Sequence, residues 1–282
     1  MTPLRASTTE AARGAALVDA ADVAHRPAGA DARIVSLVPS ITELLCDLGL
    51  ADRIAGRTGF CIHPRETVRA IPKVGGTKDV KLEKLRALEP THVIVNVDEN
   101  RRETVEEIAR FVPHVIVTHP RAPRDNLALY RLIGGLFGRE EEAERLCAAF
   151  EEAWAQARAD AAAREPREVL YLIWRDPWMT VGPDTYVSRM LAAFGWRTLP
   201  ADAEDRYPEI DLAEYAGRVD HVLLSSEPFH FKERHVPEVE ALVPSARVSL
   251  IDGEMTSWYG SRAIAGLRYL ADFTAALDRP ST

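Results

Sequence analysis

Two short stretches of the chain place aromatic residues close to arginine, and this combination suits the binding of a flat, bulky ligand. One stretch runs from Trp174 to Trp178 and reads WRDPW. The other contains Trp258 and Tyr259, with Arg262 just downstream. A macrocycle could stack on the rings and bury much apolar area, while the guanidinium could pair with a carboxylate, a phosphate or an amide. The structural alternative is that Trp174 packs in the core at the end of a strand and that Trp258 covers the final helix.

Three histidines and a cysteine are of the types that ligate metals: His63, His230, His235 and Cys61. Imidazole is a common ligand of cobalt, zinc and iron. None of these residues has i, i+4 spacing within a recognised motif, so surface or hydrogen-bonded histidines are the alternative. The sharper hypothesis is that His63 or His230 is an axial ligand of a bound cobalt or iron centre.

The sequence contains no motif that assembles a catalytic centre. It lacks the nucleophile elbow, the HExxH zinc motif, the Rossmann fingerprint and the HxE…PCxxC pattern. The turn at Gly75, Gly76 and Thr77 does not have the spacing of a phosphate loop. We therefore expect a non-catalytic protein without an intrinsic cofactor.

The elements that must position these residues alternate between strands and helices. The expected strands cover residues 34–38, 53–57, 92–97 and 114–118, and the expected helices cover residues 40–48, 81–88 and 102–111. Ser40 and Glu43 have the spacing of a capping box at the start of the first helix. Such alternation predicts a parallel sheet with helices on its faces.

A long helical stretch without a strand signal separates this half of the chain from the next. It covers residues 124–164, and Gly134, Gly135 and Gly138 are expected to break it into two helices. A helix over residues 140–163 would be about 36 Å long at 1.5 Å per residue. Because this is the length of a domain, the helix is expected to join two lobes as a stiff strut.

The second half of the chain repeats the pattern of the first. Expected strands cover residues 168–174, 221–225 and 247–251, and expected helices cover residues 186–194 and 261–277. We therefore predict an α/β fold with two Rossmann-like, parallel-sheet lobes joined by one long α-helix. The expected divisions are a disordered N-terminal tail (1–32), an N-terminal lobe (33–122), a helical linker (123–165) and a C-terminal lobe (166–282).

Folds of this kind bind ligands at the carboxyl ends of their strands, so we expect a cleft where the two sheets face each other. The loops at these ends supply the candidate ligand-binding residues. These are Ser40, Phe60, His63, Thr77, Lys78, Glu99, Asn100, Trp174, Trp178, Glu227, His230, Trp258, Tyr259 and Arg262.

Three segments carry a further signal: RIVSLVPSITELL from Arg33, the Gly-Gly-Thr turn at Gly75, and LEKLRALEPTHVIV from Leu82. Together with the single connecting helix, they resemble the iron–siderophore and cobalamin class of periplasmic binding proteins. The resemblance covers residues 33–276 and is greatest to cobalamin-binding members. It implies the class III fold, in which one long helix bridges two α/β lobes.

The resemblance also implies a function and a partner. It implies a binding protein that holds a metal chelate, cobalamin or a related corrinoid first and a siderophore or haem-like ligand second, and that delivers it to an ABC importer. Glu83 on the first lobe and Glu214 on the second fall at or near the carboxylates that meet arginines of the permease. The loops at residues 77–78 and 98–100 depart from the family, because they lack the aromatic side chains used around the corrin.

Composition narrows the partners and the location. A net charge of −8 argues against binding of nucleic acid or an anionic membrane, and no segment approaches the apolar length of a membrane span. Cys46, Cys61 and Cys147 do not form a disulfide framework. Residues 1–32 contain no apolar run long enough for a signal peptide. A cytoplasmic location is therefore expected from the sequence as written, and a periplasmic one if the start is misassigned.

Two other classes of function fit the same scaffold, because a fold does not fix a function. One is a cytoplasmic enzyme or chaperone-like handler of a metal or cofactor. The other is a regulatory or interaction module in which the cleft is vestigial.

Overall fold

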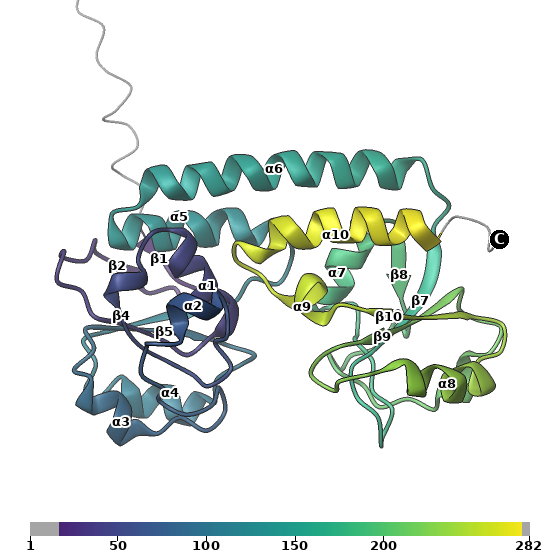
Figure 1. Cartoon of the computed structure of the whole chain (residues 1–282), viewed down its shortest axis with the longest axis horizontal. Coiled ribbons are helices and arrows are strands. Elements are labelled where there is room, and N and C mark those ends of the chain that lie inside the picture. Colours follow the sequence, from purple (N-terminus) through teal and green to yellow (C-terminus); the bar gives the residue numbers. More distant parts are fainter. Residues whose placement is uncertain (1–16, 278–282) are drawn as a thin grey trace, which may run out of the picture.

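The structure, a computed structural model, describes residues 17–277. Two α/β lobes lie side by side beneath one long helix, α6 (Glu140–Ala162) (Figure 1). Each lobe is built on a four-stranded parallel sheet. The predicted fold class is therefore confirmed. Among the described helices, none is both long and apolar enough to cross a membrane.

The sheet of the first lobe has the strand order β4-β3-β5-β6. Its strands are β3 (Ile34–Ser36), β4 (Ile54–Arg57), β5 (His92–Asn96) and β6 (His114–Thr118). The connections contain α1 (Pro39–Asp47), η2 (Ala51–Arg53), α2 (Arg65–Val68), α3 (Leu82–Ala87) and α4 (Arg102–Ile108). Every residue of β3 and β5 is buried, as expected of inner strands that helices cover on both faces.

The sheet of the second lobe has the corresponding order β8-β7-β9-β10. Its strands are β7 (Arg167–Leu172), β8 (Trp196–Thr198), β9 (His221–Ser225) and β10 (Arg247–Ile251). Its helices are α7 (Tyr186–Ala192), η3 (Leu212–Tyr215), η4 (Glu233–His235), α8 (Val236–Leu242), α9 (Gly253–Ser257) and α10 (Arg262–Leu277). In both lobes the second strand along the chain forms an edge. Strand β8 was not predicted from the sequence, because three residues are too few for a periodic signal.

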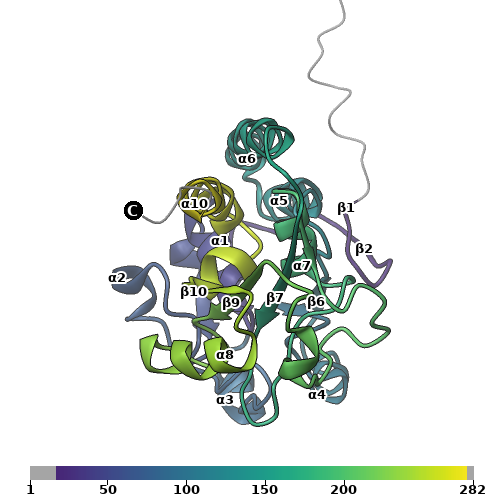
Figure 2. The same ribbon diagram turned by 90° about the vertical axis from the view of Figure 1, so that its right-hand side faces the viewer.

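The long helix α6 rests on two other helices. It packs against α5 (Asp125–Phe137) over the first lobe and against α10 over the second. Figure 2 shows the three helices end-on, with α6 above α5 and α10. Gly138, with φ of 68°, ends α5 as predicted. Gly134 and Gly135, however, lie inside α5. A Cβ atom at Gly134 would come 2.5 Å from that of Ala143, so this glycine allows α5 and α6 to approach closely.

The predicted disorder of residues 1–32 is wrong for residues 17–32, and residues 1–16 lie outside the described part. Strands β1 (Leu17–Val18) and β2 (Ala24–His25) form a hairpin. Asp19 fastens it, because its carboxylate accepts hydrogen bonds from two amides of the turn and from the amide of Val117 on the edge strand β6 (2.9 Å). The sequence of residues 17–32 is rich in alanine and aspartate and has no strand periodicity, so the hairpin was not predicted.

Candidate functional site

The loops that follow the strands of the two sheets meet between the lobes. Tyr259, after α9, donates a hydrogen bond of 2.6 Å to Glu99, which follows β5. His63, after β4, lies 3.0 Å from the Glu254 carboxylate of α9. We call this meeting place the inter-lobe site. We assign to it the segments that follow the strands of the two sheets, which are residues 37–40, 58–63, 97–100, 173–178, 199–209, 226–230 and 252–262, the last of which includes α9.

Arg262, at the start of α10, joins the two lobes within this site. Its guanidinium donates two hydrogen bonds to Glu43 of α1 (2.6 and 2.7 Å) and one to Glu254 (3.1 Å). It also lies 4.9 Å from the centre of the Trp258 ring. Only 11% of the Arg262 side chain is exposed. Because two carboxylates already compensate its charge, an anionic group of a ligand would have to displace one of them.

The predicted capping box of Ser40 and Glu43 is wrong. Helix α1 begins at Pro39, and no side chain caps its first turn. Proline suits this position, because it has no amide hydrogen that would need a partner. The helix therefore starts one residue earlier than predicted, and Glu43 turns toward Arg262 instead. The Ser40 side chain is buried beside Tyr259.

Two half-buried carboxylates, Glu99 from the first lobe and Glu227 from the second, belong to the inter-lobe site. Burial raises the pKa of Glu99 to about 7, and the negative charges of Glu227 and Asp98 add to this effect. Glu227 accepts hydrogen bonds from Ser257 Oγ (2.8 Å) and Trp258 Nε1 (2.9 Å), and burial raises its pKa as well. The site thus holds acidic groups that are not neutralised by a paired cation.

The predicted aromatic residues differ in how much surface they present. Trp258 and Tyr259 are buried. Trp178 is half-buried and stacks on Phe231, with 6.2 Å between ring centres. By contrast, 41% of Trp174 is exposed. Of these four aromatic side chains, Trp174 therefore offers the most area for stacking.

Exposed hydrophobic side chains gather on the same loops. Within residues 17–277, seven large hydrophobic side chains are exposed, and two of them belong to the N-terminal hairpin. The other five follow strands of the two sheets and are Phe60, Ile62, Val97, Trp174 and Tyr207. Of these five residues, Phe60 and Trp174 were predicted from the sequence to bind a ligand, and the other three were not. Tyr207 was missed because its loop follows β8, which was not predicted.

Three predicted ligand-binding residues hold loops of the first lobe together. The side-chain amide of the buried Asn100 donates to the carbonyl oxygens of Thr77 (2.9 Å) and Leu37 (3.3 Å). The Lys78 ammonium donates to the carbonyl oxygen of Asp98 at 2.6 Å. These bonds give all three residues a structural role, and their contact with a ligand remains a prediction.

The two candidate metal ligands have separate partners. His63 pairs with Glu254 and meets the edge of Trp258, with 5.6 Å between ring centres. His230 is exposed, and its Nδ1 lies 3.0 Å from the carbonyl oxygen of Ser226. The described residues contain no group of three or more His, Cys, Asp or Glu side chains that could hold a metal ion. A single axial bond from either histidine to a metal within a ligand stays a prediction.

A second set of polar contacts in this region was missed from the sequence. Asp98 pairs with Arg206 of the loop after β8, and it lies 3.5 Å from His119. Arg121 pairs with Asp184 at 2.6 Å. In both ion pairs the two partners are 63 or more residues apart in the chain. No local sequence pattern therefore predicts either pair. The only available signal was the run of charged residues at positions 202–206.

The two predicted docking carboxylates are both exposed. Glu83 lies in the first turn of α3, and Glu214 lies in η3, which packs against α8. Figure 1 shows α3 and α8 at the side of the two lobes that faces away from α6. The structure therefore places one exposed acid on each lobe away from the strut.

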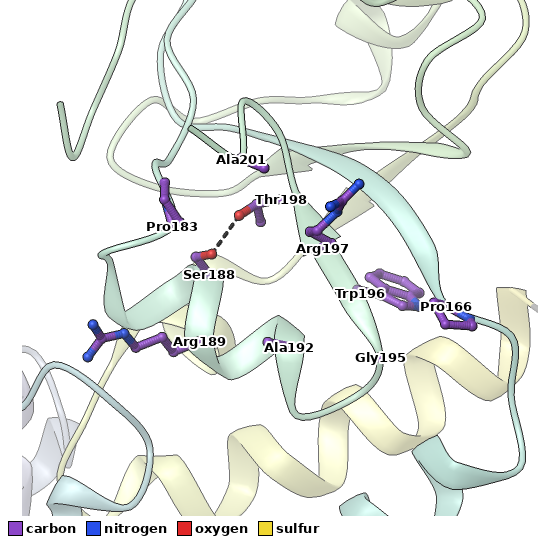
Figure 3. A pocket seen from close by; sticks show the side chains of 10 residues that line it. All are labelled: Pro166, Pro183, Ser188, Arg189, Ala192, Gly195, Trp196, Arg197, Thr198 and Ala201. Carbon is purple, nitrogen blue, oxygen red and sulfur yellow. Dashed lines mark hydrogen bonds between the residues drawn. The ribbon is translucent and has the colours of Figure 1, made fainter. Parts of the chain in front are cut away.

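One cavity lies elsewhere, between α7 and β8 of the second lobe (Figure 3). Its volume is about 490 Å³, and Ser188 and Thr198 form a hydrogen bond within its lining. Arg189 and Arg197 flank it, and each pairs with a carboxylate outside the cavity. None of the residues predicted to bind a ligand lines it.

Comparison with known proteins places this geometry in a broader context. A family model described as periplasmic binding protein matches residues 34–218. The vitamin B12-binding protein of Photorhabdus laumondii is 20% identical over 202 residues, which cover 72% of this chain and 73% of the relative. The vitamin B12-binding protein of Yersinia pestis (strain Pestoides F) is 22% identical over 206 residues, 71% of each chain.

Solved structures share the same architecture. The periplasmic heme-binding protein RhuT from Roseiflexus sp. RS-1 is 26% identical, with a TM-score of 0.73 over 87% of this chain and 99% of its own. The periplasmic vitamin B12-binding protein BtuF of Vibrio cholerae is 16% identical, with a TM-score of 0.75 over 88% of this chain and 98% of its own. At that identity the second likeness concerns the fold alone.

Proposed function

Since this chain belongs to the periplasmic binding protein family, we propose that it binds a bulky metal chelate between its two lobes, with cobalamin or another corrinoid as the first candidate. The family comprises binding proteins rather than enzymes, and the chelate is cargo rather than an intrinsic cofactor. The curated relatives are named for vitamin B12. Haem is the alternative, because the relative with 26% identity is named for heme, and a siderophore is the third.

The observation that carries this proposal is the placement of exposed hydrophobic side chains. Phe60, Ile62 and Val97 come from the first lobe, and Trp174 and Tyr207 come from the second. Because α/β folds bind ligands at the carboxyl ends of their strands, exposed apolar side chains on the segments that follow these strands are placed to contact a ligand. Aromatic rings contributed by both lobes suit the two faces of a planar macrocycle.

We also propose that the protein serves as the binding component of an ABC import system. The exposed carboxylates Glu83 and Glu214, one on each lobe, are the groups proposed to meet arginines of a permease. Family membership supports a periplasmic location for such a role, and the cytoplasmic location expected from the sequence has no support from it.

The experiment is a titration of the purified chain with cyanocobalamin, ferric haem and ferric siderophore chelates, followed by tryptophan fluorescence and visible spectra. Wild type should bind cyanocobalamin, and Trp174→Ala should weaken binding by about tenfold or more, because truncating a central aromatic contact typically costs over 1 kcal/mol. The control is Val23→Ala, an exposed hydrophobic residue of the hairpin. If no chelate changes the fluorescence or the spectrum, the proposal is wrong.

A further inference from the structure

Glu99 and Glu227 occupy equivalent positions in the two lobes. Each follows the third strand of its lobe, β5 for Glu99 and β9 for Glu227. Both are half-buried, and two adjacent residues connect them, because Trp258 donates to Glu227 (2.9 Å) and Tyr259 donates to Glu99 (2.6 Å). The repeated architecture therefore brings one acid from each lobe to the same place.

Each of these carboxylates uses one oxygen for contacts within the protein. Oε1 of Glu99 accepts from Tyr259, and Oε1 of Glu227 accepts from Ser257 and Trp258. Within residues 17–277, no hydrogen bond reaches Oε2 of either acid. Since a carboxylate can accept about four hydrogen bonds, both acids keep acceptor capacity for a ligand.

The cations of the surrounding loops have other partners. Lys78 donates to a backbone carbonyl oxygen, and Arg206 pairs with Asp98. Arg262 is shared by Glu43 and Glu254. Among residues 17–277, no Lys or Arg side chain forms an ion pair with Glu99 or Glu227, although the Lys78 ammonium acts on Glu99 from a longer distance. This part of the site therefore presents hydrogen-bond acceptors, and it carries negative charge above the pKa of Glu99, about 7.

We propose that Glu99 and Glu227 select a chelate whose rim carries neutral hydrogen-bond donors and no free carboxylates. This inference rests on the proposed function and narrows its ligand. Carboxamide groups around a corrin ring can donate N–H to the two Oε2 atoms. The propionates of a porphyrin would instead bring like charges into a poorly solvated site, where they repel strongly. The preferred class is an amide-bearing corrinoid.

The test compares three ligands on the full chain at about pH 8, where a carboxyl with a pKa of about 7 is ionised: cyanocobalamin, ferric protoporphyrin IX and the dimethyl ester of that porphyrin. Wild type should bind cyanocobalamin at least about tenfold more tightly than the free-acid porphyrin, and the ester should regain about tenfold, because like-charge contacts disfavour wrong ligands. The double variant Glu99→Gln, Glu227→Gln should bind the free-acid porphyrin more tightly. Its preference for cyanocobalamin over this porphyrin should therefore be about tenfold smaller than that of wild type. Glu103→Gln, an exposed acid of α4, is the matched control and should change nothing.

Three results would overturn the inference. One is a wild type that binds the free-acid porphyrin as tightly as cyanocobalamin. Another is a folded double variant with an unchanged preference, and the third is an ester that binds no better than the free acid. Each of these leaves the proposed function intact, since a chelate still binds. Binding of neither cyanocobalamin nor a porphyrin would also overturn the inference, and the proposed function would fall with it only if the ferric siderophore chelates do not bind either. The ester comparison uses wild type alone, so it decides the matter even if the double variant does not fold.

Discussion

The two lobes are joined in physically different ways on the strut side and on the loop side of the molecule. On the strut side, α6 packs on α5 and α10 through a buried stripe that includes Ala143, Phe150 and Ala157. On the loop side, contacts such as that of Arg262 with Glu43 are ion pairs and hydrogen bonds. Polar partners can be exchanged for those of a ligand, whereas separating the apolar stripe would expose hydrophobic area to water. Separating the loops would therefore expose less apolar area than separating the helices of the strut side.

At Gly260 the backbone of the second lobe approaches the backbone of the first lobe closely. Its φ is 77°, and a Cβ atom there would lie 3.1 Å from the carbonyl oxygen of Ser40. Its own carbonyl accepts from Tyr130 of α5 (2.8 Å), and its amide donates to Asn126 (2.6 Å). Gly260 lies between the polar contacts of the loop side and the apolar helices of the strut side. The two sides are therefore adjacent in space but differ in the kind of contact that holds them.

The largest effect is expected from breaking the strut side. Phe150→Ala should lower the free energy of unfolding by about 3–5 kcal/mol, because it removes a completely buried ring and leaves a cavity. Urea unfolding followed by circular dichroism measures it. The control, Gln156→Ala, changes an exposed residue of the same helix and should stay within about 0.5 kcal/mol. If Phe150→Ala lowers the free energy of unfolding no more than Gln156→Ala does, the apolar packing of the strut side does not hold the lobes together.

The next largest effect is a pH dependence on the loop side, caused by Glu99. Its pKa in the folded protein is about 7, against 4.5 for an ordinary glutamate, so the folded state binds the proton more tightly. The unfolding free energy should therefore fall as the pH rises from 4.5 through 7, by up to about 3 kcal/mol. The groups around Glu99 are Tyr259, Glu227, Asp98 and Lys78.

Glu99→Gln isolates this contribution, because the amide does not titrate while the neighbouring acids remain. Urea unfolding at a series of pH values should give a shallower profile for the variant between pH 4.5 and 7, and parallel profiles above about pH 8. Wild-type and variant profiles that run parallel over the whole range would show that the loop side does not destabilise the charged form of Glu99.

The difference between the two sides also explains what could be predicted from the sequence. The strut side was predictable because helical periodicity and a terminal glycine are local signals, and α6 was placed to within one residue at its end. The loops were predictable as positions, because each must follow a parallel strand. The hydrogen bonds and ion pairs between the loops could not be predicted. Arg262 and Glu43, for example, are 219 residues apart in the chain, and only the folded structure brings them together. The capping-box prediction for Ser40 and Glu43 was wrong because Pro39 occupies the first helical position. Ser40 therefore lies inside the helix rather than just before it.

A smaller effect is expected from removing the arginine that joins the lobes. Arg262→Met should destabilise the protein by about 2 kcal/mol, because it leaves the largely buried Glu43 without a cation and leaves Glu254 with His63 alone. Arg131→Met is the matched control, since Arg131 makes the same bidentate pair with Glu144 in solvent. The control should lose less than about 1 kcal/mol.

Urea unfolding of the single and double variants of Arg262 and Glu43 gives the coupling between them. Glu43→Gln in the Arg262→Met background should cost much less than in wild type, because its partner is already gone. Additive losses in this cycle, or equal losses at Arg262 and Arg131, would show that the lobes do not depend on this pair.

The smallest change in stability is expected from removing a single hydroxyl group on the loop side, that of Tyr259. Tyr259→Phe removes the hydrogen bond to Glu99 and should cost about 1 kcal/mol. Because this bond favours the charged carboxylate, its loss should also raise the pKa of Glu99 and move the pH-dependent fall in stability to higher pH. Tyr186→Phe is the control, since that buried hydroxyl accepts from Asn126 rather than binding an acid. It should lose similar stability without moving the pH profile. A Tyr259→Phe profile that stays in place would mean that burial and charge repulsion alone set the pKa of Glu99.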